Sequence, residues 1–166
     1  MAILAERGAS VIGIANGGRA EGVRKAGAAH VIDRATEDVV AAVRAFTDGR
    51  GVAAVYDPIG MATFEISLQL LASRGCLINY GELSGPVPEL NLNRLFAGSL
   101  FVTKYNGNRW VEGFHEFAGL IAEGLAMAKK YPAVVSEVAG RFRLDAAADA
   151  YRALVLGPQG KVLVLP

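Results

Sequence analysis

The residues best suited to bind a ligand lie directly after four short apolar runs, VIGIA, HVI, AAVYD and CLINY. Each run is followed by glycine, an amide or a charged side chain: Asn16-Gly17-Gly18-Arg19, Asp33-Arg34, Pro58-Ile59-Gly60 and Gly81-Glu82-Leu83-Ser84-Gly85. Glycine lets a backbone approach a flat or charged ligand closely. In an open α/β sheet, ligands bind outside the carboxyl ends of the strands. Any one of these loops alone is an ordinary turn, but four of them at one sheet edge predict a binding site.

The elements that must position these loops alternate along the chain. Seven branched apolar runs are typical of strands: SVIGIA, HVID, GVAAVYD, GCLINYG, SLFVT, AVVSEV and KVLVLP. Most lack polar alternation, as do parallel strands that are covered on both faces. Helical spacing appears in TEDVVAAVRAF, where Thr36 is the expected N-cap, and in MATFEISLQLLA, RWVEGFHEFAGLIAEGLA and LDAAADAYRALV. This alternation predicts one α/β domain over residues 1–166, doubly wound around a mostly parallel sheet.

Composition excludes several classes of partner. The 166 residues carry 17 Lys plus Arg and 16 Asp plus Glu, a balance that favours neither nucleic acid nor an anionic membrane. No apolar run is long enough to predict a membrane span, and the N-terminal residues lack the pattern of a signal peptide. Cys76 is the single cysteine, which suits the reducing cytoplasm. We therefore expect a cytoplasmic α/β protein that binds a small molecule.

The end of VIGIA indicates which nucleotide this site would take. In a dinucleotide-binding fold, an acid at the end of the second strand binds the ribose 2′-hydroxyl of NAD, whereas a nearby Arg accommodates the 2′-phosphate of NADP. Asn16 stands where the acid is expected, and Arg19 and Arg34 follow nearby. Two guanidinium groups suit a phosphate dianion. The pattern favours NADPH, although two solvated arginines near a helix start would give the same sequence.

Other chemistry is sparse in the sequence. Cys76, His30 and His115 lack the paired spacing of metal ligands, so no metal site is predicted. No Gly-x-Ser-x-Gly or similar triad appears, and the catalytic residues stay unknown. Tyr80 is either a proton donor or a packing residue. The run 49–54 fits Gly-x-Gly-x-x-Ala but precedes a strand, so its amides cannot hold a pyrophosphate at a helix N-terminus.

Five segments carry a resemblance to a known family: RGASVIGIANGGRAEGVRKAGAAHVIDR, GRGVAAVYDPIG, ASRGCLINYGELSGPVPELN, GSLFVTK and GKVLVLP. They resemble zinc-independent medium-chain dehydrogenase/reductases, most closely the quinone oxidoreductases related to zeta-crystallin, from about Ala5 to Pro166. The resemblance implies a Rossmann-type domain that binds NADPH, in enzymes of the EC 1.6.5 type that transfer hydride to quinones or enones. The GroES-like catalytic domain of that family is absent from this sequence.

The resemblance also assigns cofactor-binding positions. Asn16 matches the position beneath the adenosine ribose, Arg19 a position that often bears a Lys on the 2′-phosphate, and Arg34 a Tyr or His on the adenosine side. Gly60 and Met61 match the loop over the middle of the cofactor. Tyr80, Gly81 and Glu82 match the main-chain lining of the nicotinamide. The two changes to Arg keep the pocket basic and leave its geometry undetermined from sequence.

The first strand of the Rossmann fold and its Gly-x-Gly-x-x-Gly turn have no counterpart in this sequence. The family comparison makes MAILAERG the helix that follows that turn, and we expect a fragment of a longer parent. In the strand order 3-2-1-4-5-6 the first strand lies between the second and the fourth. Those two strands then lose a neighbour, or pair with each other, or receive a strand from another chain. We expect the isolated chain to be inactive.

Several alternatives stay open from sequence. The same domain serves enoyl-thioester reductases, whose distinguishing residues lie largely in the missing domain. The chain is alternatively a truncated, non-catalytic dimerisation module. GSLFVTK should form an outer strand able to pair with a second copy, which predicts a homodimer through residues 99–104. S-adenosylmethionine is a further possible ligand of such a fold, but the paired arginines argue against it.

Overall fold

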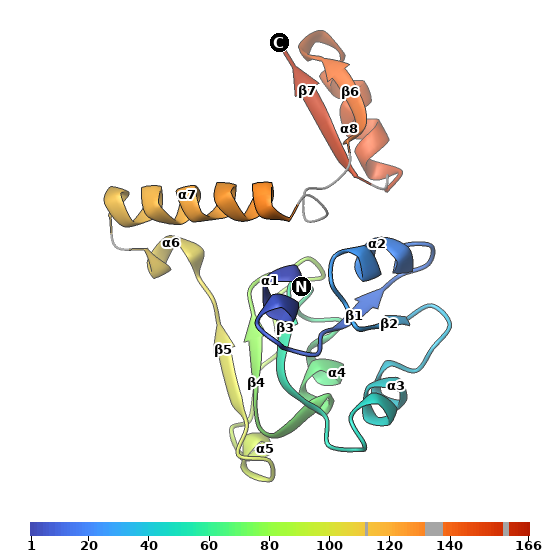
Figure 1. The fold of residues 1–166 in the computed structure, drawn as a ribbon, viewed down its shortest axis with the longest axis vertical. Helices are drawn as coiled ribbons and strands as arrows, with labels where there is room; N and C mark the ends of the chain where they lie inside the picture. Colours follow the sequence, from blue (N-terminus) through green and yellow to red (C-terminus); the bar gives the residue numbers. More distant parts are fainter. Residues whose placement is uncertain (112, 132–137, 158–159) are drawn as a thin grey trace.

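The computed structural model describes residues 1–111, 113–131, 138–157 and 160–166. Within them the strands form three separate parallel sheets, in the orders β1-β2, β3-β4-β5 and β6-β7 (Figure 1). Their bounds are β1 Ile12–Ala15, β2 His30–Asp33, β3 Val52–Asp57, β4 Leu71–Asn79, β5 Phe101–Lys104, β6 Val138–Arg143 and β7 Lys161–Leu165. The predicted α/β architecture with parallel strands is confirmed.

Helices connect these strands. Their bounds are α1 Ala2–Glu6, α2 Ala20–Lys25, α3 Val39–Phe46, α4 Phe64–Gln69, α5 Asn93–Phe96, α6 Gly107–Trp110, α7 Phe114–Lys130 and α8 Ala147–Val155, preceded by a 3₁₀ turn at Leu144–Ala146. No helix in the described ranges combines the length and the apolar character that a membrane span requires.

No hydrogen-bonded ladder joins β1 to β3 in the described part of the chain. β1 pairs with β2, from Ile12 opposite His30 to Ala15 opposite Asp33, and β3 pairs with β4. These are the two strands that were predicted to lack a neighbour, and they do not pair with each other. Each therefore keeps one row of backbone groups outside any ladder.

Two apolar clusters hold the loops of the predicted site in place. Ile32, Val43 and Leu70 are buried together beneath α3. The second cluster contains Phe64, Leu68, Leu71 and Leu77. The side chain of Val55 in β3 packs against both clusters, so β3 ties the two halves of the core together.

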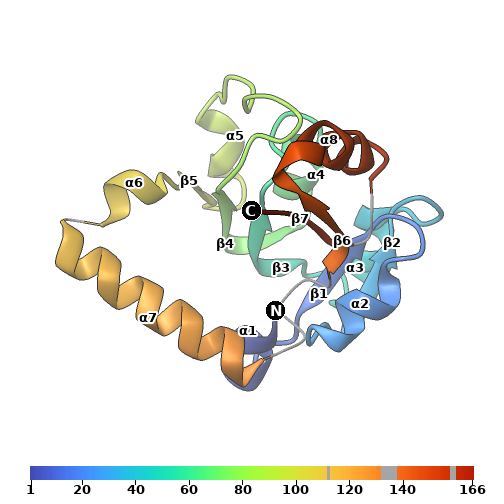
Figure 2. The ribbon, with the colours of Figure 1, turned by 90° about the horizontal axis from the view of Figure 1, so that it is seen from above.

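The C-terminal strands form a unit of their own. β6 and β7 pair in parallel and α8 packs on them. Figure 1 shows this unit beyond α7 along the long axis of the molecule, and Figure 2, seen from above, shows α7 to one side of it. Helix α7 is tied to α1 by an ion pair of 2.5 Å between Lys130 and Glu6. The strand expected from AVVSEV lies outside the described residues except for Val138, where β6 begins. The single-domain assignment of residues 1–166 stays a prediction.

Two local predictions are wrong in detail. Asp38, not Thr36, caps α3, because its carboxylate accepts the N–H of Ala41 at 2.9 Å. Helix α4 ends at Gln69, and the next residues already belong to β4, which begins at Leu71. The apolar run at the end of MATFEISLQLLA is thus divided between a helix and a strand, which periodicity alone does not distinguish.

The Gly-x-Gly run at 49–54 follows α3 and enters β3, which begins at Val52, so it precedes a strand and not a helix, as predicted. Gly51 has a φ of +84° where β3 begins, and a Cβ there would lie 2.5 Å from the carbonyl oxygen of Leu70. Gly49 has a φ of +77° but no atom within 4 Å of such a Cβ. A side chain at either glycine would strain the backbone, but only a side chain at Gly51 would also collide with neighbouring atoms.

We expect Gly51→Ala to destabilise the protein more than Gly49→Ala. The left-handed backbone costs each variant about 1–2 kcal/mol. The contact with the Leu70 carbonyl adds about 1–3 kcal/mol for Gly51→Ala alone. Urea denaturation measures both free energies of unfolding, and equal losses for the two variants would contradict the observed packing of the β3 start against Leu70.

Candidate functional site

The first part of the site lies at the carboxyl ends of β1 and β2. Gly17 and Gly18 turn the chain after β1 with φ values of +39° and +57°. The Asp33 carboxylate at the end of β2 accepts the N–H groups of Gly17 and Ala35, each at 3.0 Å. The hydrogen bond from Gly17 fastens the turn after β1 to the end of β2.

The same two N–H groups, Ala35 first and then Gly17, hold the pKa of the Asp33 carboxyl below its ordinary value. Asp33 therefore stays ionised well below neutral pH. Sequence reasoning placed Asp33 at this strand end but missed its bond to Gly17. That bond was not foreseeable from two residues 16 positions apart in the chain.

The predicted residues Asn16, Arg19 and Arg34 meet at this pair of strand ends. All three are exposed, and the Arg34 N–H continues the ladder by donating to the Ala15 carbonyl at 3.0 Å. Neither guanidinium has a carboxylate partner among the described residues. Two cationic groups thus remain accessible to an anion beside a glycine turn.

The second part of the site is built around Asp57, the last residue of β3. Only 3% of Asp57 is exposed. Its carboxylate accepts the N–H groups of Ile59 at 2.8 Å and Gly60 at 3.2 Å, and the hydroxyls of Thr63 at 2.8 Å and Ser67 at 2.9 Å. Four donors from the following loop and helix therefore satisfy this buried carboxylate, and no ion pair of Asp57 occurs among the described residues.

Asn79, the last residue of β4, connects this loop to the next one. It is 1% exposed, and its amide N–H₂ donates to the Asp57 carbonyl at 3.2 Å and to the Gly81 carbonyl at 2.8 Å. Its Oδ1 atom is buried without a hydrogen-bond partner in the described part of the chain. Asn79 thus fixes the exits of β3 and β4 against each other.

The two loops also bond directly. Met61 N–H donates to the Gly85 carbonyl at 3.1 Å, and Ser84 N–H donates to the Ile59 carbonyl at 2.8 Å. A Cβ at Gly60 would lie 2.5 Å from the Gly85 oxygen, and one at Gly81 would lie 2.4 Å from the Pro58 oxygen. The two loops pass so close to each other that neither position has room for a side chain, which explains why both residues are glycine.

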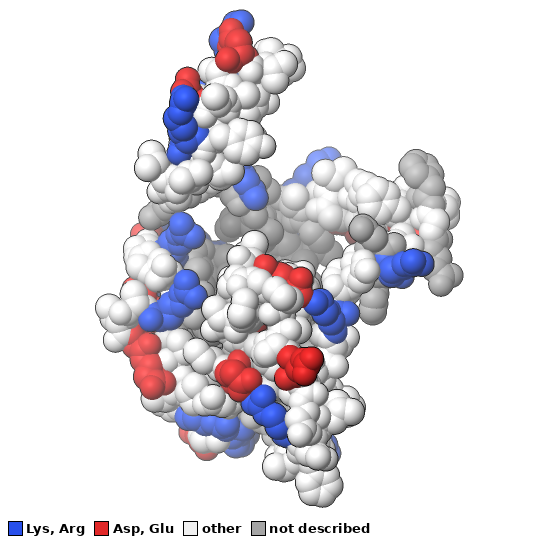
Figure 3. All heavy atoms as spheres, turned by 180° about the vertical axis from the view of Figure 1, so that it is seen from behind, with Lys and Arg blue, Asp and Glu red and all other residues white. Residues whose placement is uncertain are grey.

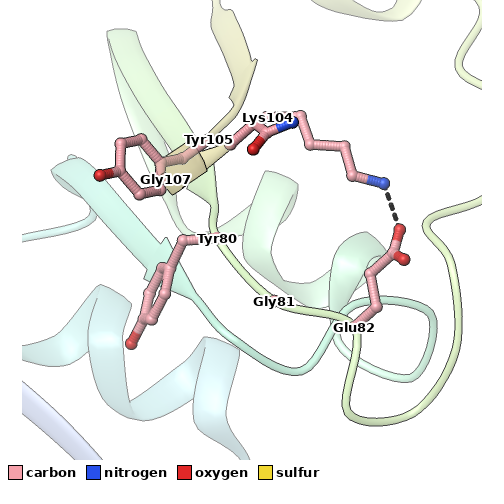
Figure 4. A pocket seen from close by; sticks show the side chains of 7 residues that line it. Tyr80, Gly81, Glu82, Lys104, Tyr105 and Gly107 are labelled. Carbon is pink, nitrogen blue, oxygen red and sulfur yellow. Dashed lines mark hydrogen bonds and ion pairs between the residues drawn. The ribbon is translucent and has the colours of Figure 1, made fainter. Parts of the chain in front are cut away.

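A hollow of about 500 Å³ opens beside these loops at the carboxyl ends of β4 and β5 (Figure 4). It is lined by Tyr80, Gly81, Glu82, Lys104, Tyr105, Asn106 and Gly107. The Lys104 ammonium forms an ion pair with the Glu82 carboxylate. Figure 4 shows the two tyrosine rings on one side of the strand ends and this ion pair on the other.

The structure therefore divides the predicted residues into groups. Tyr80, Gly81 and Glu82 line the hollow, while Gly60 and Met61 belong to the neighbouring loop. The arginine group lies on the separate β1-β2 sheet. Sequence reasoning missed residues 104–107 as lining residues, and the polar sequence after β5 was the available signal.

Charge and metal ligands add two further observations. On the face shown in Figure 3, basic and acidic side chains are interspersed. Among the described residues, no three His, Cys, Asp or Glu side chains gather closely enough to hold a metal ion.

The Asp57 network gives a stability prediction. Asp57→Ala leaves two buried N–H groups and two hydroxyls without their acceptor, and should lower the free energy of unfolding by about 2–4 kcal/mol. Asp57→Asn keeps one carbonyl acceptor and should cost less. Chemical denaturation measures the loss, and hydrogen exchange at residues 59 and 60 should accelerate in Asp57→Ala. Unchanged exchange there would mean that the carboxylate does not hold the loop.

Three comparisons relate this geometry to known proteins. Quinone oxidoreductase 1 of Escherichia coli K12 is 36% identical over 139 residues, which cover 75% of this chain and 42% of that protein. The 2-haloacrylate reductase of a Burkholderia species is 36% identical over 172 residues, which cover 96% of this chain and 49% of that protein. The crystal structure of Escherichia coli quinone oxidoreductase complexed with NADPH superimposes with a TM-score of 0.84 at 31% identity, covering 99% of this chain and 52% of that one.

These matches span about half the length of each relative. The family described as zinc-binding dehydrogenase matches residues 1–126, which contain β1 to β5 and both parts of the site. The resemblance to quinone oxidoreductases and the Rossmann-like fold are confirmed. The chain belongs to the zinc-binding dehydrogenase family, within which the relatives above are quinone oxidoreductases and a 2-haloacrylate reductase.

Proposed function

We propose that this chain is the cofactor-binding part of a cytoplasmic oxidoreductase that transfers a hydride from NADPH to a quinone or an activated alkene. The observation that carries the proposal is that accessible or ligand-sized features follow the strands at their carboxyl ends: two exposed arginines after β1 and β2, two interlocked glycine loops after β3 and β4, and an open hollow after β4 and β5. A relative crystallised with NADPH and relatives named for quinone and haloacrylate reduction support it.

The residues present fit such a cofactor. Arg19 and Arg34 would hold the 2′-phosphate, with Asn16 beneath the adenosine ribose. The loop at Gly60 and Met61 would cover the middle of the cofactor, and Tyr80, Gly81 and Glu82 would line its nicotinamide. At Gly60 and Gly81 the neighbouring backbone leaves no room for a side chain, so the main chain there could approach a flat ring closely.

NADPH when bound supplies the hydride, so the protein need only orient the two reactants and exclude water. The Asp57 and Asn79 hydrogen bonds serve orientation, because they fix the loops that would flank the ring. The reaction moves a hydride to the acceptor and adds a proton from water. Oxidation of NADPH by the protein as encoded, followed at 340 nm with 1,4-benzoquinone, tests this function, and no oxidation with quinones or activated alkenes would overturn it.

The 166 residues alone would contact the adenosine and the nicotinamide, but they contain no Gly-x-Gly-x-x-Gly turn from a strand into a helix for the pyrophosphate. Ordering a long flexible ligand offsets much of this contact energy. We therefore expect this chain by itself to bind NADPH with a dissociation constant of about 100 µM or weaker, and to reduce no quinone.

The arginine assignment is testable on this chain with adenosine 2′,5′-bisphosphate, which carries the distinguishing phosphate without the nicotinamide. Arg19→Ala or Arg34→Ala should each weaken its binding by about 1.5–3 kcal/mol, because a charge-assisted hydrogen bond to the 2′-phosphate is lost. Binding of AMP should change little. Arg50→Ala serves as control, since Arg50 pairs with Asp48 in the turn before β3. If calorimetry gives both arginine variants the wild-type affinity, the 2′-phosphate does not bind there.

We further propose a homodimer across residues 99–104. β5 is an edge strand in the described sheet, and Phe101 on it is 61% exposed. Tyr105 N–H donates to the Asn79 carbonyl, so by alternation the N–H groups of Val102 and Lys104 face away from β4. These outward groups are able to pair with a second β5.

Phe101→Glu places a charge in that interface and should convert dimers to monomers, because two like charges would be buried close together. Tyr151→Glu, at another well-exposed aromatic residue, on α8, should leave the dimer intact. Sedimentation velocity distinguishes the two species. A monomeric wild type at micromolar concentration contradicts the proposed dimer.

A further inference from the structure

The hollow at the ends of β4 and β5 contains two oppositely charged side chains that cancel. Glu82 and Lys104 are paired, and the remaining lining residues are two tyrosines, two glycines and an asparagine. The pair comes from two different strand ends, 22 residues apart. Through this pair, the Glu82 carboxylate lies against the Lys104 ammonium group at the edge of the hollow.

The ion pair adds little to stability. The side chains of Lys104 and Glu82 are 55% and 38% exposed. Pairs this exposed contribute little to folding because water screens them. What the pair changes is the potential inside the hollow, since an entering anion meets a carboxylate as well as an ammonium group.

The relatives show that acceptor charge varies in this family. One is named for quinones, which are uncharged, and another for 2-haloacrylate, which carries a carboxylate. An accessible lysine would favour the second kind of acceptor. The two tyrosine rings, 51% exposed at Tyr80 and 40% exposed at Tyr105, offer flat apolar surface that suits the first.

We propose that Glu82 determines the charge preference of this site. By pairing with Lys104 it leaves the hollow without net charge, so that uncharged flat acceptors are selected over carboxylates. Glu82 is a specificity-determining residue, acting through Lys104. The inference rests on the proposed function, because it concerns the acceptor of that same hydride.

A charge series tests this inference. Wild type and the double variant Glu82→Gln/Lys104→Gln have no net charge from this pair, Glu82→Gln has +1 and Lys104→Gln has −1. Two acceptors that differ in charge are compared, 2-chloroacrylate and 2-chloroacrylamide. The quantity compared is kcat/KM for 2-chloroacrylate divided by kcat/KM for 2-chloroacrylamide. A general loss of activity affects both values and cancels in this ratio.

In the protein as encoded, Glu82→Gln should raise this ratio in favour of the carboxylate by about five- to tenfold, as expected for a unit charge a few ångströms away in partly screened surroundings. Lys104→Gln should lower it by a similar factor, and the double variant should return to the wild-type ratio. Both shifts should shrink in 0.5 M salt. Glu65→Gln is the matched control, because it breaks the 2.5 Å ion pair with Arg94 outside the hollow.

A second readout does not depend on turnover. Propionate and propionamide are titrated into the 166-residue chain, and the amide resonances of residues 81, 82, 104 and 105 are followed by NMR. Glu82→Gln should strengthen propionate binding relative to propionamide binding, and Lys104→Gln should weaken it. The double variant should match the wild type. A ratio that Glu82→Gln leaves unchanged, or a shift that persists in the double variant, overturns the inference. If no variant oxidises NADPH with any acceptor while propionate binding follows the charge order, the proposed function is wrong and the charge assignment stands.

Discussion

A buried carboxylate needs several hydrogen-bond donors, and Asp57 obtains its donors from the segment directly after it. This requirement shapes the site more than any other interaction. Satisfying the carboxylate bends residues 57–63 back over the end of β3, which brings Gly60 and Met61 against the loop that follows β4. Because Asn79 spans both exits, a displacement of one loop would break hydrogen bonds in the other. The two loops therefore behave as one preorganised unit.

The arginine group lacks such a connection to this unit. It sits on β1 and β2, and no ladder joins β1 to β3 in the described residues. The shared core compensates in part, since Leu70 packs with Ile32 of β2 and Val43, and Val55 of β3 packs against the same cluster. Apolar packing is less directional than a strand ladder. Within the described residues, the two parts of the site are therefore joined by side-chain contacts and not by a strand ladder.

The sequence predicted the regular parts of this fold well because their signals are local. Branched runs identified β1 to β5, and the residues after β4 that were predicted to bind the cofactor are three of the seven that line the hollow. It failed where the outcome depends on tertiary contacts. Both Asp38 and Thr36 could cap α3 by residue type, and the sequence alone does not show that Asp38 does so. The run after Phe64 is divided between α4 and β4 because its last residues pair with β3. Asp57 went unnoticed because its role appears only when Thr63 and Ser67 converge on it.

Charge is distributed unevenly between the two ends of the site, and the arrangement matches the chemistry proposed for each. At the adenosine end, Asp33 is bound to backbone N–H groups and leaves Arg19 and Arg34 without a carboxylate partner among the described residues. At the other end, Glu82 pairs with the lysine instead. Each end of the site thus has an acid, but main-chain N–H groups bind Asp33 whereas a side-chain cation binds Glu82. The two guanidinium groups thus remain without an ion pair where a phosphate would bind, whereas the ammonium group is paired where a hydride would be delivered.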